Sequence, residues 1–410
     1  MARAAAIRSI TVPRGFKAAG ATCGIKPSGQ ADLALIVSDR PCSAAGVLTT
    51  SRMPGAPVIV ARNHLSQGRA RAIICNSGIA NVATGAAGVR DARRICAQVG
   101  RLIDCPARSV LPCSTGLIGP RLPMDKIESG IETIVPMLSR GPRADSRAAS
   151  AIMTTDLVPK SAVRHFRCGP SGSPLLHLGG IAKGSGMIAP QMATMLAFIT
   201  TDIAIGPPVL RAALKSAVDL TFNRISIDTD TSTSDAVLIL ASGVGGTTRI
   251  ARRSSAYARF TDALTDLCDD LARQIVRDGE GATRTIQVKV ERAASDRDAD
   301  HIGRSITNSP LIKTAVHGAD PNWGRLVMAV GKSGARVDPA RLTLSIADVV
   351  LFRRGAAIPL KAPTRRKLKN LMRRREVIIK VNLGLGRASC RWLGCDLSPE
   401  YVKINAQYTT

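Results

Sequence analysis

The sequence has few aromatic side chains, fewer acids than bases, and no long apolar run. Phenylalanine, tyrosine and tryptophan make up only 3% of its 410 residues, so the stacking platforms that single-stranded nucleic acids need are scarce. No apolar run approaches the roughly 18 residues needed to cross a bilayer. The N-terminus also lacks the apolar segment of a secretion signal. We therefore expect a cytoplasmic protein that does not bind a membrane.

The shortage of acids leaves a formal net charge of +27. Residues 365–375 form a dense basic run, and such runs can neutralise phosphates. The sequence contains no helix-turn-helix, zinc-finger or RNP pattern, and the other excess charges are spread along the chain. We interpret the run as a solvated basic helix and expect no nucleic-acid partner. A nucleic-acid-binding protein built on charge remains an alternative class.

Paired cysteines and metal-ligand spacings are also missing. The ten cysteines are scattered without a CxxC pair, which in a chain of this length is typical of reduced core thiols. The closest pair, Cys390 and Cys395, has no second pair at zinc spacing. The five histidines show no ligand spacing, and GxSxG is absent. We expect neither a metal nor a cofactor.

Short apolar runs alternate with helical patterns, which predicts a mixed α/β or α+β protein. A helical face is marked by Phe260, Leu264, Leu267, Leu271 and Ile275, spaced by three or four residues. We expect a surface loop at 139–146. The other predicted helices are 88–103 and 125–138, and the predicted strands are 32–38, 56–61, 70–75, 236–241, 284–290, 342–346 and 377–381.

The glycine-rich stretch 183–196 contains Ala193 followed by Thr194. A threonine hydroxyl inside an intact chain is a poor nucleophile. If the bond before Thr194 were cut, the new α-amino group would lie within reach of Oγ. Its pKa of about 7.7–8.0 leaves a useful neutral fraction near pH 7. A terminal amine of this kind is a known activator of a threonine nucleophile.

Four other glycine-containing or polar segments are candidates for a site. Ser114-Thr-Gly116 follows an apolar run, so Thr115 and Gly116 could aim donors at an oxyanion or form an ordinary strand-ending turn. Residues 76–81 are equally ambiguous. Residues 228–235 suggest either caps and turns or a polar site. In 278–283, Glu280 could bind a substrate cation or lie in a surface loop.

Together these segments resemble the ornithine acetyltransferase family of arginine biosynthesis, whose members are also called glutamate N-acetyltransferases. The resemblance covers nearly the whole chain and keeps the family's order of motifs. The markers are Gly24-Ile-Lys26, Ser114-Thr-Gly116, Met153-Thr-Thr-Asp156, Lys183-Gly-Ser-Gly186, Ala193-Thr-Met195, Asp278-Gly-Glu-Gly281, Lys313-Thr-Ala315, Asp320-Pro-Asn-Trp-Gly-Arg325, Gly394-Cys-Asp-Leu397 and Tyr401-Val-Lys-Ile-Asn405.

The resemblance implies a layered αββα sandwich that cuts itself between Ala193 and Thr194. The products would be an α chain, 1–193, and a β chain, 194–410, which interlock and assemble as an α2β2 heterotetramer. Thr194 would take acetyl from N2-acetyl-L-ornithine and pass it to L-glutamate in a ping-pong cycle. Acetyl-CoA is a second candidate donor, and its use stays open.

Family roles carry over onto matching residues of this sequence. Thr194 is the nucleophile, and Thr115 and Gly116 form the oxyanion hole. Lys183 suits a substrate carboxylate, and Glu280 suits a substrate ammonium. The substrate-binding set that the resemblance implies is Thr154, Lys183, Thr194, Glu280, Asn405 and Thr410.

The chain departs from the family pattern at several positions that leave these candidate residues in place. Ile79, Gln191, Ser234, Asn382 and Arg387 each replace a residue usual in the family. Thr229 stands where glycine is usual, so we expect strain in a turn with positive φ there. The alternative activity is an N-terminal-nucleophile amidase or aminopeptidase on a related fold.

Overall fold

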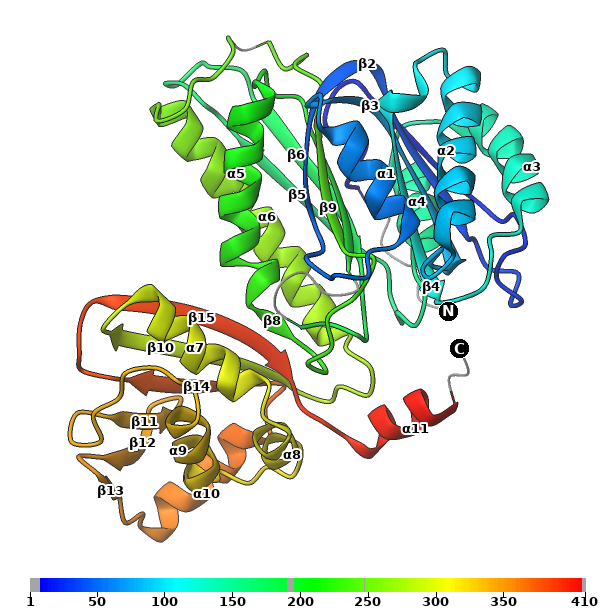
Figure 1. Cartoon of the computed structure of the whole chain (residues 1–410). Coiled ribbons are helices and arrows are strands. Elements are labelled where there is room, and N and C mark those ends of the chain that lie inside the picture. The colour runs from blue at the N-terminus through cyan, green and yellow to red at the C-terminus, as the bar shows by residue number, and fades with distance from the viewer. Residues whose placement is uncertain (1–7, 190–194, 247, 408–410) are drawn as a thin grey trace.

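The structure, a computed structural model, describes residues 8–189, 195–246 and 248–407. It contains two β-sheets, each with its own helices (Figure 1). The larger sheet runs β4-β3-β2-β9-β7-β6-β5, with β1 beside β2, and the smaller runs β13-β12-β11-β14-β10-β15-β8. The strands of the larger sheet are β1 (Phe16–Ala21), β2 (Leu33–Leu48), β3 (Arg69–Ile79), β4 (Val110–Leu117), β5 (Lys160–Phe166), β6 (Leu176–Lys183), β7 (Leu196–Thr201) and β9 (Ala236–Ala241).

All strands of the smaller sheet except β8 follow residue 277 in the chain. Its strands are β8 (Ile225–Ser226), β10 (Thr285–Ala293), β11 (Thr343–Ile346), β12 (Val349–Arg353), β13 (Ala356–Ala357), β14 (Glu376–Asn382) and β15 (Ala388–Cys395). The helices are α1 (Ala56–Leu65), α2 (Gly85–Leu102), α3 (Met124–Ile134), α4 (Pro142–Ala151), α5 (Pro207–Leu220), α6 (Ser255–Arg277), α7 (Asp296–Thr307), α8 (Pro310–His317), α9 (Trp323–Gly331), α10 (Ala362–Met372) and α11 (Pro399–Gln407).

The larger sheet splits at β2 into two halves that pack face to face. The first part of β2 pairs with β1 and β3, whereas its last part, from Ser43, pairs with β9. Alternate side chains of β2 enter different cores: Leu33 and Leu35 lie in the core that includes α2 and α3, while Ala34 and Ile36 face strands β6, β7 and β9. Strands β7 and β9 alternate in the same way, and their other face packs against α5 and α6.

The resulting layers are helices α1–α3, one half-sheet, the other half-sheet, and helices α5–α6. This confirms the predicted αββα sandwich. The predicted helical face on α6 is also confirmed, since all five of its residues are fully buried in the core under the second half-sheet. The predicted helices at 88–103 and 125–138 correspond to α2 and α3, and each predicted strand except 56–61 overlaps an observed one.

Two local predictions were wrong. Residues 56–61 were expected to form a strand but begin α1, because Pro57 stands in its first turn, where a missing N–H costs nothing. Residues 139–146 were expected to be a surface loop, but α4 starts at Pro142 and Asp145 is buried. The Asp145 carboxylate accepts the N–H groups of Ser9 and Thr11 at 2.7 and 2.9 Å, so it ties the start of the described chain to this helix.

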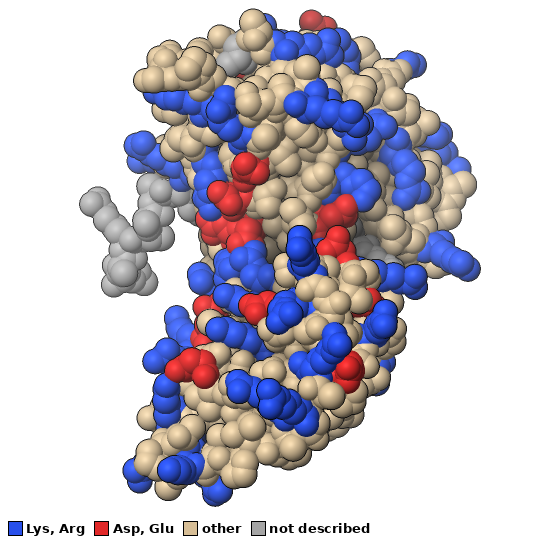
Figure 2. Space-filling model, turned by 90° about the vertical axis from the view of Figure 1, so that its left-hand side faces the viewer, with Lys and Arg blue, Asp and Glu red and all other residues tan. Residues whose placement is uncertain are grey.

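The smaller sheet and its helices enclose a second core, and one of these helices, α10, contains most of the basic run. β10 lies between β14, which is parallel to it, and β15, which is antiparallel. The run at 365–375 is mostly helix α10, which buries Leu368 and Met372 and exposes most of its cations. On the face shown in Figure 2, lysine and arginine side chains are scattered over the whole surface and do not form one continuous basic patch. The helical interpretation of the run is therefore confirmed.

The cysteines are reduced, as the sequence predicts. All ten cysteines are free thiols, and most are buried. Among the described residues, no helix is both long and apolar enough to cross a membrane.

Candidate active site

The Ser114-Thr-Gly116 motif lies at the carboxyl end of β4, beside the 76–81 segment at the end of β3. The two strands are parallel, with Gly116 opposite Gly78, so both polar segments reach the same edge. Gly116 has φ +125°, and a side chain there would collide with the Gly78 backbone. Glycine is therefore required where these strands end. Ser114 Oγ donates to Asn76 Oδ1 at 2.5 Å and joins the two segments.

Lys183, the last residue of β6, reaches the same edge from the facing half-sheet. Its side chain is only 2% exposed. Nζ donates to Thr154 Oγ1 at 2.7 Å and to Thr115 Oγ1 at 3.4 Å. Burial lowers the pKa of Lys183, and the nearby Asp156 carboxylate acts against that shift. The structure thus brings together three of the residues that the sequence singled out.

A buried network of ion pairs adjoins Lys183 and Thr154. Lys160 Nζ donates to Asp156 Oδ1 and to Asp278 Oδ2, both at 2.6 Å. Asp156 also accepts the Gly184 N–H at 2.6 Å and lies 3.9 Å from Lys183 Nζ. Burial alone would raise the pKa of Asp156, but the ammonium groups of Lys183 and Lys160 lower it to about 2. The carboxylate therefore stays ionised at neutral pH.

Glu280 occupies the loop between α6 and β10 and faces this cluster. Its N–H donates to the Ser185 carbonyl at 2.8 Å, and a side chain at Gly186 would collide with its carboxylate. The Glu280 carboxylate is close enough to Lys183 to raise the pKa of that lysine, against the larger effect of burial. Asn405 Nδ2, on α11, donates to Glu280 Oε2 at 2.9 Å. One site therefore presents a cation and an anion.

Gly281 explains how α11 approaches Glu280. This glycine has φ +67°, and a Cβ there would lie 2.5 Å from the backbone nitrogen of Tyr401. Ser398 Oγ donates to the Gly281 carbonyl at 2.6 Å. The close packing holds the start of α11 against the Glu280 loop.

Ala193, Thr194 and Thr410 lie outside the described residues, so their predicted roles stay predictions. The strands that precede and follow this stretch are neighbours: β6 ends at Lys183, and β7 begins at Leu196 as its antiparallel partner. The N–H of Met195, which follows Thr194 in the chain, donates to Asp235 Oδ1 at 2.7 Å. Asp235 is fully buried, and burial raises the pKa of its carboxyl well above the usual value.

The 228–235 segment, for which the sequence suggested either caps and turns or a polar site, supplies a side-chain carboxyl acceptor for a backbone N–H group at each end. Asp228 Oδ1 accepts the Ile188 N–H at 2.7 Å, and Asp235 accepts that of Met195. Burial raises the pKa of Asp228 to about 6. The two carboxylates thus hold the described residues before and after 190–194. Thr229 has φ +74°, which confirms the positive-φ turn expected there.

Sequence reasoning missed the residues that support the site from below. Asp156 belongs to the marker Met153-Thr-Thr-Asp156, but the sequence did not indicate a role for it. Asp235 is the last residue of the acid-rich segment 228–235. Lys160 lies in none of the motifs, and although Asp156 is four positions away, its other partner, Asp278, lies 118 positions away. Within the described ranges, no group of three or more histidine, cysteine, aspartate or glutamate side chains could hold a metal ion.

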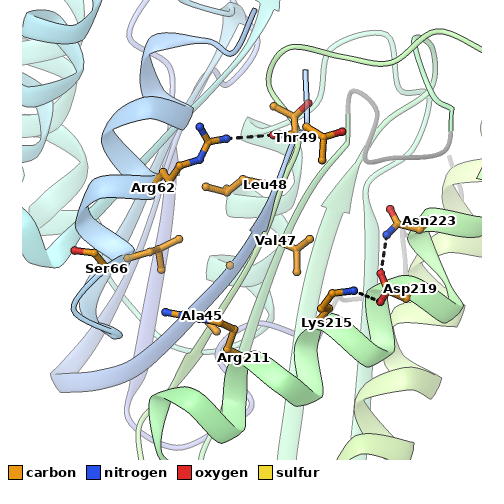
Figure 3. A pocket seen from close by; sticks show the side chains of 13 residues that line it. Ala45, Val47, Leu48, Thr49, Arg62, Ser66, Arg211, Lys215, Asp219 and Asn223 are labelled. Atoms are coloured by element: carbon orange, nitrogen blue, oxygen red, sulfur yellow. Dashed lines mark hydrogen bonds and ion pairs between the residues drawn. The ribbon is translucent and has the colours of Figure 1, made fainter. Parts of the chain in front are cut away.

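A pocket of about 690 Å³ lies away from these residues, between α1 and α5 (Figure 3). Its floor is the last part of β2, around Val47, and Arg62, Arg211 and Lys215 line its sides. Arg62 donates to the Thr49 carbonyl at 3.3 Å, and Lys215 pairs with Asp219. None of the described candidate residues lines this pocket. Its size therefore does not identify it as the reaction site.

Comparisons with known proteins agree over nearly the whole length. Residues 17–410 match the model of the ArgJ family. The chain is 42% identical over 403 residues to the arginine biosynthesis bifunctional protein ArgJ of Symbiobacterium thermophilum, covering 98% of each. The protein of the same name from Gloeobacter violaceus is 44% identical over 404 residues, again with 98% of each covered.

A solved structure is similar as well. The crystal structure of arginine biosynthesis bifunctional protein argJ from Bacillus halodurans has 39% identity and a TM-score of 0.50. The match covers 52% of this chain and 98% of the solved chain, which is therefore about half as long as this one.

Proposed function

The chain belongs to the ArgJ family, and we propose that it transfers acetyl from N2-acetyl-L-ornithine to L-glutamate through an acetyl ester on Thr194. Such a protein is a glutamate N-acetyltransferase of arginine biosynthesis. Acetyl-CoA as a further donor, an α2β2 assembly and a cytoplasmic location belong to the same proposal.

The contact of Lys183 with Thr115 and Thr154, with Glu280 nearby, is the observation that carries the proposal. N2-Acetylornithine has a carboxylate at one end and an ammonium at the other, with the acetyl amide between them. A buried ammonium suits the first group and a carboxylate suits the second, through charge-assisted hydrogen bonds. The hydroxyl of Thr115 contacts Lys183 at 3.4 Å, so the candidate oxyanion hole adjoins the substrate cation.

The place of Thr194 in the topology supports self-cleavage. A cut before it falls between β6 and β7, two antiparallel neighbours of one sheet. Strands β7 and β9 of the second product lie between β2 and β6 of the first. The products 1–193 and 194–410 would remain interlocked by these ladders. A relative whose solved chain is about half as long supports the same cut.

The chemistry then needs only the new terminus and the oxyanion donors. The neutral α-amine accepts the Oγ proton while Oγ attacks the acetyl carbonyl carbon. Donors at Thr115 and Gly116 stabilise the oxyanion. The carbon–nitrogen bond breaks, and the α-ammonium returns its proton to the departing ornithine amine. The α-amine of glutamate next attacks the ester, N-acetylglutamate leaves, and Oγ regains a proton.

A transfer assay with the purified protein tests the proposal and separates it from an amidase. The expected result is a cut protein that forms ornithine and N-acetylglutamate in equal amounts. Thr194→Ala should remain one full-length band and transfer nothing. Release of free acetate from N2-acetylornithine at the same rate with or without glutamate would instead indicate an amidase.

A further inference from the structure

Lys160, the first residue of β5, is a fully buried lysine with every ammonium donor occupied. Nζ donates to Asp156 at 2.6 Å, to Asp278 at 2.6 Å and to the Val158 carbonyl at 3.3 Å. An ammonium has three donors and no acceptor, so this set is complete. Lys160 therefore has no donor left for a ligand, and its role must be exerted through its partners.

The first partner, Asp156, organises the two segments that carry Thr154 and Lys183. Its carboxylate accepts the Thr154 N–H at 3.0 Å and the Gly184 N–H at 2.6 Å. Thr154 Oγ1 in turn accepts from Lys183 Nζ. The orientation of Asp156 thus fixes the backbone on both sides of that contact.

The second partner, Asp278, connects the same cluster to the Glu280 loop. Its carboxylate accepts the Leu157 N–H at 3.0 Å, and its carbonyl accepts from Ser185 Oγ at 2.6 Å. Glu280, two residues after Asp278, donates its N–H to the Ser185 carbonyl. The Lys160 ammonium consequently links, through its two carboxylate partners, the segments that carry Thr154, Lys183 and Glu280.

Asp156 lies between two lysines, but the two contacts are unequal. Lys160 Nζ is 2.6 Å from Asp156 Oδ1, whereas Lys183 Nζ is 3.9 Å from Oδ2 and donates instead to two threonine hydroxyls. Buried charges are strongly driven to pair, because each has lost its hydration. Without Lys160, Lys183 would be the nearest cation to Asp156 in the described part of the chain.

We propose that Lys160 is a positioning residue that occupies Asp156 and so leaves the Lys183 ammonium available to the carboxylate of the substrate. The inference rests on the proposed function, in which Lys183 binds that carboxylate. Lys160 then sets the preference for carboxylate-bearing donors without touching the substrate.

Two double variants of equal net charge test this role. Lys160→Met/Asp278→Asn leaves Asp156 ionised, so Lys183 is drawn to it. Lys160→Met/Asp156→Asn removes that competing carboxylate and leaves Lys183 on its hydroxyls. Each variant removes one buried cation and one buried anion, so a general loss of packing or charge affects both. Thermal unfolding checks that each is folded.

The readout is kcat/KM for two acetyl donors, N2-acetylornithine and N-acetyl-1,4-diaminobutane, which differ only in the carboxylate. We expect Lys160→Met/Asp278→Asn to lose about 10- to 100-fold with the first donor, the equivalent of one charge-assisted hydrogen bond. It should change by less than about threefold with the second. Lys160→Met/Asp156→Asn should keep the wild-type ratio of kcat/KM for the two donors, while the altered contacts of residue 156 with the Thr154 and Gly184 N–H groups lower both values.

Three results would overturn the inference. Equal losses of kcat/KM with both donors in Lys160→Met/Asp278→Asn would show that Lys160 has only a structural role. Retained preference in both variants would show that Asp156 does not compete for Lys183. A wild-type enzyme without any preference for the carboxylate donor would sink the assigned role of Lys183 as well, which separates failure of the proposed function from failure of the inference.

Discussion

Replacing Lys183 by methionine removes the buried ammonium at the centre of the site and keeps most of the side-chain volume. Two of the three ammonium donors are used on Thr154 and Thr115, so one is left for a substrate carboxylate. Asp156 keeps Lys160 as its ion-pair partner at 2.6 Å. We expect the variant to fold.

The expected loss follows from the single donor. A hydrogen bond to a charged group contributes about 1.5–3 kcal/mol, or roughly a 10- to 150-fold change in an equilibrium constant. Lys183 is nearly fully buried, so solvent does not weaken the interaction as it would at the surface. The loss should appear as a higher KM for N2-acetylornithine, because the carboxylate is bound in both ground and transition states.

Steady-state kinetics with saturating glutamate gives KM and kcat for the wild type, Lys183→Met and the surface control Lys215→Met. Lys215 is 70% exposed and pairs with Asp219, so its variant should match the wild type. The reasoning fails if Lys183→Met changes KM by less than about threefold, or if kcat falls while KM stays constant.

Three further changes give independent tests. Gly116→Ala would push a side chain into the Gly78 backbone at φ +125°, so we expect kcat to fall by about 100-fold or more, whereas near-normal turnover would exclude an oxyanion hole here. Thr229→Gly should stabilise the protein by about 1 kcal/mol, since φ +74° is costly for a branched residue; calorimetry should show a higher melting temperature, and a lower one would contradict this. The lowered pKa of Asp156, about 2 against 3.8, contributes about 2 kcal/mol that is fully present above pH 3.8 and lost as the pH falls through 2. Unfolding of Asp156→Asn should therefore approach that of the wild type in acid, and a constant difference across this range would refute the assignment.

The helices and strands that could be predicted from the sequence are those that a local pattern of residues determines. The step of three or four between Phe260 and Ile275 marks a face that is fully buried on α6. The order of layers came from the family resemblance, because periodicity alone does not say that β2 serves two half-sheets. Residues 56–61 were misread because a short apolar β-branched run suits a strand or a buried helix equally, and Pro57 together with packing decides for α1.

The site divides in the same way. Thr115, Lys183 and Glu280 stand in glycine-containing motifs, which sequence alone can identify. Lys160 and Asp235 stand out less in the sequence. Lys160 has one partner four positions away, Asp156, but its second partner comes from another part of the fold, and so does the N–H group that Asp235 accepts. Lys160 meets Asp278 across 118 positions, and Asp235 receives the Met195 N–H across 40. Only the folded chain shows these contacts.

The central claim, an acetyl ester on Thr194 of a cut chain, is tested most directly by intact mass spectrometry of the purified protein. We predict two masses, for 1–193 and 194–410, with threonine at the new N-terminus. After N2-acetylornithine is added without glutamate, the 194–410 fragment should become heavier by one acetyl group, and glutamate should remove it. A single uncut mass, or a cut protein whose fragments never gain acetyl, would contradict the account.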